Sequence, residues 1–363
     1  MNDRLARLRE IMAAQPYDAL IITQPENRRY LSGFTGSAGV LVIDDAQASM
    51  LTDFRYYEQV RQQAPMCALV EVTGAAHAAL AELVRQRGYR TLGFERHAVT
   101  VQTYDRWREA LGDAIEWHPT ENIVEGLRVV KDDDEIAAIN AAVRLADEAM
   151  AHIMEWIRPG LTEREVAWEL EVAMRTRGAE SLSFPTIVAS GPHGAMALAV
   201  TGGREIGLGD PVVIDMGCVV DGYCSDLTRS FCVGRADTRY REVWDKVLEA
   251  QLAAEEGIHA GMSGVEADAI ARRILYAAGY EGQFGHGLGH GVGLAIHEEP
   301  RASFLAEGDL PAGSVLTVEP GVYIPGWGGV RIEDMVVVEE SGCRVLTAVE
   351  KVPVAGSATP GAA

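Results

Sequence analysis

The sequence predicts a two-domain protein of the α/β (α+β) class. Its 363 residues exceed the size at which one hydrophobic core usually divides, and 48% of them are hydrophobic. Helix-like and strand-like segments alternate through residues 1–125, as in a small α/β domain. Residues 126–353 contain one pattern of helices and strands twice. We therefore expect two domains, followed by a disordered tail over residues 354–363.

The first domain shows helical periodicity and short apolar runs that are typical of buried strands. Expected helices cover residues 4–14 and 75–88, and expected strands cover residues 19–22, 39–43 and 48–51. The segment 122–134 ends in acidic residues that suit the first turn of a helix, so we place the domain boundary in its first part, after residue 125.

Two helices are expected at the start of the second domain. An apolar stripe runs from Ile136 to Ile157 and is followed by a glycine. Thr162 and Glu165 have the spacing of a capping box, which predicts the start of a second helix that ends near Gly178.

The same pattern recurs about a hundred residues later. Five residues repeat at a constant offset of 101: Ile258, Gly261, Ser263, Glu266 and Gly279 correspond to Ile157, Gly160, Thr162, Glu165 and Gly178. Two carboxylate pairs extend the match, since Asp215 corresponds to Glu319 and Asp226 to Glu333, at offsets of 104 and 107. The repeat indicates an internal duplication, and we expect its halves to pack about a pseudo-twofold axis.

Asp215 and Asp226 lie in a stretch, residues 211–231, that otherwise has the composition of buried strands. A buried ionised carboxylate is costly unless it is paired, hydrogen-bonded or bound to a metal. If the two halves pack symmetrically, four carboxylates converge, and four negative charges require cations nearby. The sequence therefore predicts a metal site, and this much charge suits two ions better than one.

Histidines are available in a glycine-rich segment, residues 283–301. It contains His286, His290 and His297, and its glycines fit no phosphate-binding motif. His297 and the glutamate after it do not continue as the two-histidine motif of a zinc peptidase. Pro300 would also break the helix that such a motif needs.

These residues together resemble a known family. The motifs IDMG, CSDLTR, GHGVG, VEPGVY and GVRIED are similar to those of the pita-bread metallopeptidases, which include methionine aminopeptidase, prolidase and aminopeptidase P. Residues 1–125 resemble the N-terminal domain of the creatinase, prolidase and aminopeptidase P branch. The resemblance implies five metal ligands, namely Asp215, Asp226, His290, Glu319 and Glu333. It also implies two divalent ions, for which we expect Mn²⁺, with Co²⁺ and Zn²⁺ as alternatives.

The resemblance assigns a role to each ligand. Asp226 and Glu333 would bridge the two ions. Asp215 would bind one ion, and His290 and Glu319 would bind the other. Glu319 would also act as the general base toward an attacking water.

Further residues are implied by the same resemblance. His297 would stabilise the oxyanion or contact the substrate. Arg331, which we group with the substrate-binding residues, would hold a ligand carboxylate. Arg301 would line the proline side of the cleft, or else be an ordinary surface charge. Arg55 and Tyr56 belong to a D-x-R-Y motif that resembles bacterial small aminopeptidases P and would contact a peptide, with an ordinary strand end as the alternative.

One position departs from the family pattern. Leu198 stands where the family has a catalytic histidine, and leucine neither transfers a proton nor donates to an oxyanion. His193, five residues earlier, is the alternative source of an imidazole, although on a strand an odd offset would point it to the other face. Position 295, often acidic in the family, is Ala295.

The expected activity is release of the N-terminal residue from peptides with proline at the second position. One alternative is an Xaa-Pro dipeptidase (prolidase). Another, motivated by Leu198, is a creatinase-like non-peptidase hydrolase of a small guanidino or cyclic amidine compound. The last alternative is a binding or regulatory protein on a peptidase scaffold.

Composition restricts the partners and the compartment. The net charge of −21 disfavours nucleic acid and anionic membrane surfaces as partners. No apolar run approaches the length of a membrane span. Five cysteines without framework spacing fit a reducing compartment, so we expect a cytoplasmic protein. The family resemblance suggests a homo-oligomer, either a dimer or a tetramer.

Overall fold

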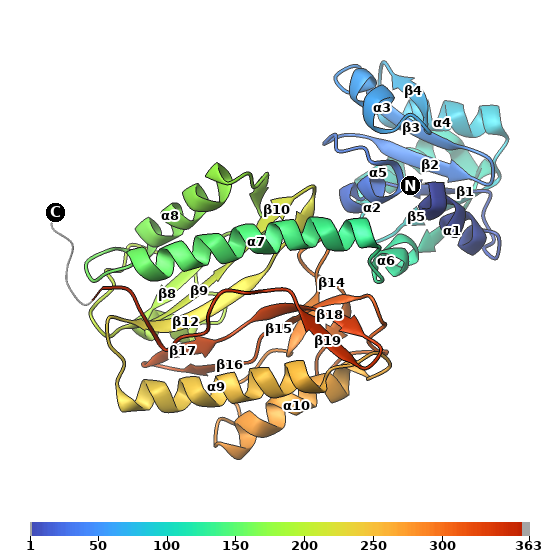
Figure 1. Cartoon of the computed structure of the whole chain (residues 1–363). Coiled ribbons are helices and arrows are strands. Elements are labelled where there is room, and N and C mark those ends of the chain that lie inside the picture. The colour runs from blue at the N-terminus through green and yellow to red at the C-terminus, as the bar shows by residue number, and fades with distance from the viewer. Residues whose placement is uncertain (1, 358–363) are drawn as a thin grey trace. The chain divides into compact units, whose positions relative to one another are not determined.

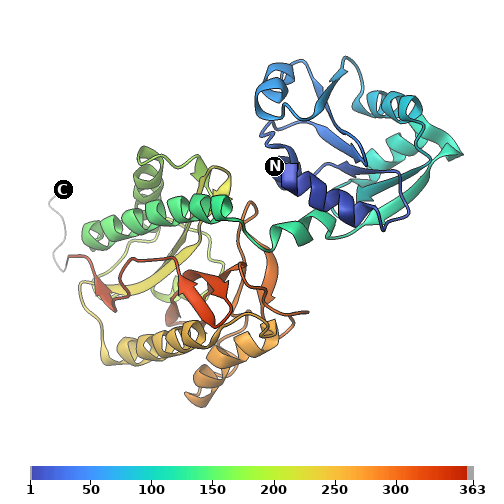
Figure 2. The same cartoon turned by 45° about the vertical axis from the view of Figure 1, so that its right-hand side comes forward.

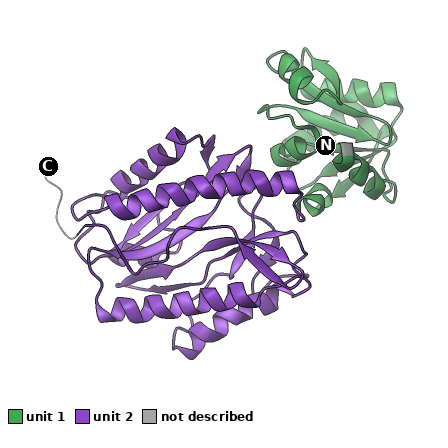
Figure 3. Cartoon of the chain, in the orientation of Figure 1, with its two compact units in different colours: residues 1–128 green, residues 129–363 purple. Residues whose placement is uncertain are grey.

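The computed structural model describes residues 2–357. The chain divides into two compact units, Met1–Arg128 and Val129–Ala363, which Figure 3 colours green and purple. The boundary expected from the sequence follows residue 125, three residues earlier than this division. Within the described residues, no helix is both long enough and apolar enough to cross a membrane.

A six-stranded mixed sheet forms the N-terminal unit (Figure 1). In order across the sheet its strands are β4 (Ala68–Val72), β3 (Ala48–Asp53), β2 (Val40–Asp44), β1 (Ala19–Ile22), β5 (Thr91–Glu95) and β6 (Glu116–Thr120). Strand β2 runs antiparallel to both of its neighbours, and the other adjacent pairs are parallel. The helices are α1 (Asn2–Met12), α2 (Pro25–Ser32), α3 (Tyr57–Gln63), α4 (Ala76–Arg87), α5 (Val101–Leu111) and α6 (Ile123–Arg128), with a short 3₁₀ helix, η1 (Gly112–Ala114).

The sequence pattern explains the centre of this sheet. All four residues of β1 are buried, as expected for an apolar run with partner strands on both sides and side chains packed on both faces. The five segments predicted here from periodicity are confirmed to within two residues at each end.

Two helix pairs flank the strands of the C-terminal unit, and Figures 1 and 2 show them on opposite sides. The pairs are α7 (Asp133–Trp156) with α8 (Glu163–Thr176), and α9 (Thr238–Gly257) with α10 (Gly264–Ala277). Capping boxes begin α7, α8 and α10, on Asp132, Thr162 and Ser263. Each box satisfies two backbone N–H groups that a helix start leaves without a partner. The starts predicted from Thr162 and Ser263 are therefore confirmed.

The strands of this unit form four sheets. One contains β20 (Val354–Ala355), β12 (Leu227–Val233), β9 (Pro211–Met216) and β8 (Ile187–Ser190). A second contains β14 (Glu298–Ala302), β13 (Gly289–Gly291), β15 (Val315–Val318), β18 (Asp334–Glu339) and β19 (Gly342–Val345). The smaller two are β11 (Tyr223–Cys224), β10 (Cys218–Val220) and β7 (Ser181–Leu182), and β16 (Gly321–Ile324) with β17 (Gly328–Arg331). A 3₁₀ helix, η2 (Gly191–Ala195), follows β8.

The predicted internal repeat is visible in the order and pairing of these elements. Helices α7 and α8 precede the antiparallel pair β9–β12, and α9 and α10 precede the antiparallel pair β15–β18. Each half buries its own hydrophobic cluster between its helices and strands. The second carboxylate of each half, Asp226 or Glu333, directly precedes the returning strand.

The predicted disordered tail is wrong at its start. Val354–Ala355 forms β20, which pairs in parallel with Cys232 and Val233 of β12. Cys232 also donates its backbone N–H to the carbonyl of Pro353 at 3.0 Å. The prediction rested on the small residues of this segment. Composition carries no information about the unpaired edge of β12, with which the segment pairs. The rest of the predicted tail, residues 358–363, lies outside the described residues.

Candidate metal centre and active site

Two strands of the first half carry Asp215 and Asp226. Asp215 lies within β9 opposite Thr228 of β12, and Asp226 is the residue just before β12. Both residues are buried, with exposed fractions of 9% and 5%. Burial of both carboxylates, which the sequence predicted from the apolar residues around them, is thus confirmed.

The second half brings Glu319 and Glu333 to the same place. Glu319 follows β15, and Glu333 precedes β18, which pairs with β15. The halves are joined at this point because Glu333 donates its backbone N–H to the carbonyl of Thr228 at 3.1 Å. The hydroxyl of Thr228 in turn donates to Oε2 of Glu333 at 2.6 Å.

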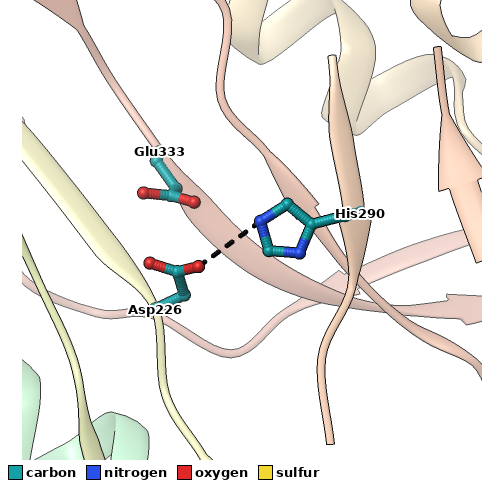
Figure 4. A group of neighbouring side chains, drawn as sticks. All are labelled: Asp226, His290 and Glu333. Atoms are coloured by element: carbon teal, nitrogen blue, oxygen red, sulfur yellow. Dashed lines mark ion pairs between the residues drawn. The ribbon is translucent and has the colours of Figure 1, made fainter. Parts of the chain in front are cut away.

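His290 from β13 points at Asp226 and Glu333, as Figure 4 shows. Its Nε2 atom lies 3.5 Å from Oδ2 of Asp226 and 3.5 Å from Oε1 of Glu319. Its Nδ1 atom lies 3.1 Å from the carbonyl oxygen of Gly291. A carbonyl can only accept, so Nδ1 carries the proton and the lone pair of Nε2 faces the carboxylates.

The atoms that face one another at this site therefore all offer lone pairs and no proton. Such an arrangement needs cations between them. Ligand atoms of Asp226, His290 and Glu333 all lie within 4.8 Å of one another. Burial, and then repulsion from neighbouring carboxylates, raises the pKa of Asp226 and Glu333 well above the ordinary range. Oδ1 of Asp215 is buried without a hydrogen bond from any described residue. Carboxylates with one imidazole suit hard or borderline divalent ions, so the residues fit the predicted metal site.

Arg331 supplies a fixed positive charge at the rim of this donor set. Its guanidinium is buried and donates to Oδ2 of Asp215 at 2.5 Å, to the Tyr323 hydroxyl at 2.7 Å and to the carbonyl of Ala197 at 3.2 Å. Its Nε donates to the hydroxyl of Thr228 at 3.0 Å. The N–H groups of Arg331 therefore bind acceptors within the protein, and one of these acceptors is the Asp215 carboxylate.

His297 and Arg301 lie beside His290. The rings of His290 and His297 meet edge to face, with centroids 4.4 Å apart. Arg301 sits directly opposite His290 in the β13–β14 pair, and its side chain is 42% exposed. Desolvation, followed by the charge of Arg301, lowers the pKa of His297, which favours the neutral imidazole.

The segment around Leu198 lies next to Arg331, since Ala197 accepts one of its hydrogen bonds. The side chain of Leu198 is 85% exposed. The nearby His193 is occupied elsewhere, because its Nδ1 atom lies 2.9 Å from the carboxylate of Glu163. Glu163 is fully buried and also accepts from the backbone and hydroxyl of Ser190. His193 thus anchors this loop to helix α8.

Several residues of the site were not identified from the sequence. Tyr323 joins Arg331 to His286, whose Nε2 lies 3.0 Å from the Tyr323 hydroxyl. Lys131 forms a buried ion pair with Glu298, the residue after His297, at 2.7 Å. No local pattern marks Tyr323 or Lys131, because each acts through a partner that is distant in the sequence. His286, by contrast, was singled out as one of three histidines in the glycine-rich segment, although no role was assigned to it.

Arg55 and Tyr56 belong to the N-terminal unit. The Arg55 guanidinium makes a two-pronged pair with Asp53, with both contacts at 2.8 Å. The hydroxyl of Tyr56 is 2.6 Å from that of Ser37, and its ring meets Phe34 edge to face. The motif is thus ordered within its own unit, and its contact with a substrate stays a prediction.

The chain is similar to peptidases over nearly its whole length. The model of metallopeptidase family M24 matches residues 137–340, and that of the creatinase/prolidase N-terminal domain matches residues 4–130. A protein of Pyrococcus furiosus named Xaa-Pro dipeptidase is 37% identical, with 97% of this chain and 99% of that protein covered.

Two solved structures extend the similarity to three dimensions. The Xaa-Pro dipeptidase from Bacillus anthracis has a TM-score of 0.94 at 42% identity, covering 97% of this chain and 99% of the other. The X-Pro aminopeptidase from Thermotoga maritima has a TM-score of 0.89 at 36% identity, covering 96% and 99%.

Proposed function

The chain belongs to metallopeptidase family M24, and on that basis we propose that it is an Xaa-Pro dipeptidase, which hydrolyses the bond between an N-terminal residue and a C-terminal proline. The observation that carries this proposal is full-length similarity to proteins named Xaa-Pro dipeptidase, in sequence and in fold. The buried cluster of carboxylates and His290 supports it, because a metallopeptidase requires such a donor set.

Two divalent ions are the cofactors of this proposal, with Mn²⁺ first and Co²⁺ or Zn²⁺ as alternatives. Asp215, Asp226, His290, Glu319 and Glu333 would hold them. When bound, the ions polarise the scissile carbonyl and lower the pKa of an attacking water. Members of the family use divalent metals, and the oxygen-rich donor set supports a hard or borderline ion.

Glu319 acts as the general base. Burial raises the pKa of its carboxyl to about 7 in the metal-free protein, and a bound cation would favour the ionised form that accepts a proton. Its Oε1 atom accepts from the Thr317 hydroxyl at 3.2 Å, which orients the carboxylate. Glu319 takes a proton from the attacking water and delivers it to the leaving proline nitrogen.

The cationic and imidazole side chains orient the substrate. His297, neutral and packed on His290, donates to the oxygen that becomes negative during attack. Arg301, exposed and opposite His290, binds the C-terminal carboxylate of an Xaa-Pro dipeptide. Arg331 binds Asp215 and favours its ionised form, and Arg55 and Tyr56 remain candidate contacts to the substrate.

A second candidate is an Xaa-Pro aminopeptidase acting on longer peptides. The motif containing Arg55 and Tyr56 and the similarity to the Thermotoga maritima structure support it. The two activities are separated by comparing an Xaa-Pro dipeptide with the matching Xaa-Pro-Xaa tripeptide, each with Mn²⁺ added to metal-depleted protein. We expect faster cleavage of the dipeptide. Faster cleavage of the tripeptide would favour the aminopeptidase, and failure to cleave either would overturn both.

Leu198 favours a third candidate, a creatinase-like hydrolase that cleaves no peptide. Metal analysis separates it from the others, because two bound ions per chain support the peptidases and an empty site after expression with Mn²⁺ supports the hydrolase. We also propose a homo-oligomer, a dimer or tetramer, which the mass in solution tests directly.

A further inference from the structure

Helix α10 carries a buried acid–base pair that contacts the backbone leading to the metal ligands. We propose that Asp268 and Arg272 are positioning residues, which fix the separation of His290 and Glu319 and so set the affinity of the ion that these two ligands share. The inference rests on the metal centre of the proposed function.

The two side chains form a two-pronged pair one helical turn apart. Arg272 Nε donates to Oδ2 of Asp268 at 2.6 Å, and Nη2 donates to Oδ1 at 2.8 Å. The Asp268 side chain is 1% exposed and that of Arg272 13%. A desolvated pair of this kind contributes little net stability, because the cost of burying both charges offsets their attraction. We therefore expect the pair to act by fixing the positions of the backbone groups that it binds.

Arg272 fixes one side of the glycine-rich segment. Its Nη1 donates to the carbonyl of Phe284 at 2.9 Å, and Nη2 donates to the carbonyl of His286 at 2.7 Å. The guanidinium also lies over the ring of Phe284, 4.2 Å from its centroid, and 4.8 Å from that of Phe304. A planar group with several fixed donors holds two carbonyls and one carboxylate at once, which lysine cannot do.

Asp268 fixes the residue that joins the two ligands. Oδ1 of Asp268 accepts from the backbone N–H of Leu288 at 2.9 Å. The carbonyl of Leu288 accepts from the backbone N–H of Glu319 at 2.8 Å. Two residues further on is His290, which donates its own N–H to the Thr317 hydroxyl at 3.0 Å. Leu288 thus connects the helix to both ligands.

This pair serves only one half of the duplicated domain. At the offset of 101 residues, Asp268 corresponds to Ala167 and Arg272 to Glu171, so the first half lacks an equivalent pair. Asp215 is held instead by Arg331. Loss of the Asp268–Arg272 pair is therefore expected to affect the ion bound by His290 and Glu319 and to spare the one bound by Asp215.

The test is calorimetric titration of metal-depleted full-length chain with Mn²⁺, with bound metal counted after dialysis. The wild type is expected to take up two ions. Arg272→Lys keeps the charge. It is expected to weaken the binding of one ion by about tenfold or more and to leave the affinity for the other unchanged, as for loss of a residue that orients a ligand. Asp268→Asn is expected to act in the same direction.

The matched control is the exposed pair of Glu171 and Arg175 on α8, which has the same spacing. Arg175→Lys and Glu171→Gln should leave both affinities unchanged. Two unaltered affinities in Arg272→Lys, or an equal loss at both ions, would overturn the inference, even if Asp268→Asn does not fold. Because metal binding is the readout, a chain that binds two ions but cleaves no proline peptide would refute the proposed function and leave this inference intact.

Discussion

Nη2 of Arg331 lies 2.5 Å from Oδ2 of Asp215, across 116 residues of sequence. The contact joins β17 of the second half to β9 of the first, beside three further carboxylates. Burial raises the pKa of the Asp215 carboxyl, and among described residues Arg331 is the fixed cation that touches it, so Arg331 offsets part of this effect of burial.

Replacing this cation should destabilise the metal-depleted protein. Arg331→Met leaves the buried Asp215 without its partner, which typically costs about 3–5 kcal/mol. Urea unfolding in the presence of chelator measures the loss. The control is Arg344→Met, which breaks an exposed pair with Glu339 and should cost at most about 1 kcal/mol. Equal losses in the two variants would contradict the prediction.

Restoring a histidine at position 198 should increase peptidase activity. Leu198→His places an imidazole next to the carbonyl of Ala197, which contacts Arg331. A positioned acid–base group contributes roughly 10²–10⁴-fold, and we expect a gain in kcat toward the lower end. Val200→His, at a position that is 83% exposed, is the control. An unchanged kcat in Leu198→His would show that the enzyme has no use for an imidazole at this position.

His297 and His193 should respond differently to substitution. His297→Gln is expected to lower kcat by roughly 10²-fold, because His297 stabilises the oxyanion in the proposed mechanism. His193→Gln should leave kcat unchanged and lower thermal stability, because His193 binds the buried Glu163. Steady-state kinetics and thermal unfolding of both variants measure this. A large fall in kcat for His193→Gln would mean that this residue takes part in the reaction.

Alkaline pH should destabilise the N-terminal unit through Cys67. Burial raises the pKa of this thiol to about 11 in the folded chain, against about 8.5 in an unfolded one. Between these values only the unfolded state releases the proton. The contribution of Cys67 to the free energy of unfolding is therefore complete below pH 8.5 and is lost as pH rises toward 11.

The corresponding measurement compares wild type with Cys67→Ala at pH 8 and at pH 10.5, with unfolding followed by the fluorescence of the N-terminal unit. We expect the wild type to lose about 2 kcal/mol more than the variant between the two pH values. Equal losses of unfolding free energy in the wild type and the variant would show that Cys67 ionises equally in the folded and unfolded states.

The sequence alone determined where several helices and strands begin and which residues were candidates. Thr162 and Ser263 mark helix starts through bonds that span three residues, and such local geometry is encoded in local sequence. The repeat at an offset of 101 gave the two halves. Asp215 and Asp226 were identified because charged residues within apolar strands are costly unless something compensates them.

Only the tertiary structure decided which partners these residues have. The binding of His193 to Glu163, the pairing of Val354–Ala355 with β12, and the link from Asp268 through Leu288 to Glu319 join segments that are far apart in the chain. Such contacts depend on how packed helices and strands bring backbone groups together, and no local pattern specifies them. Composition and periodicity predict burial, whereas packing decides what a buried group touches.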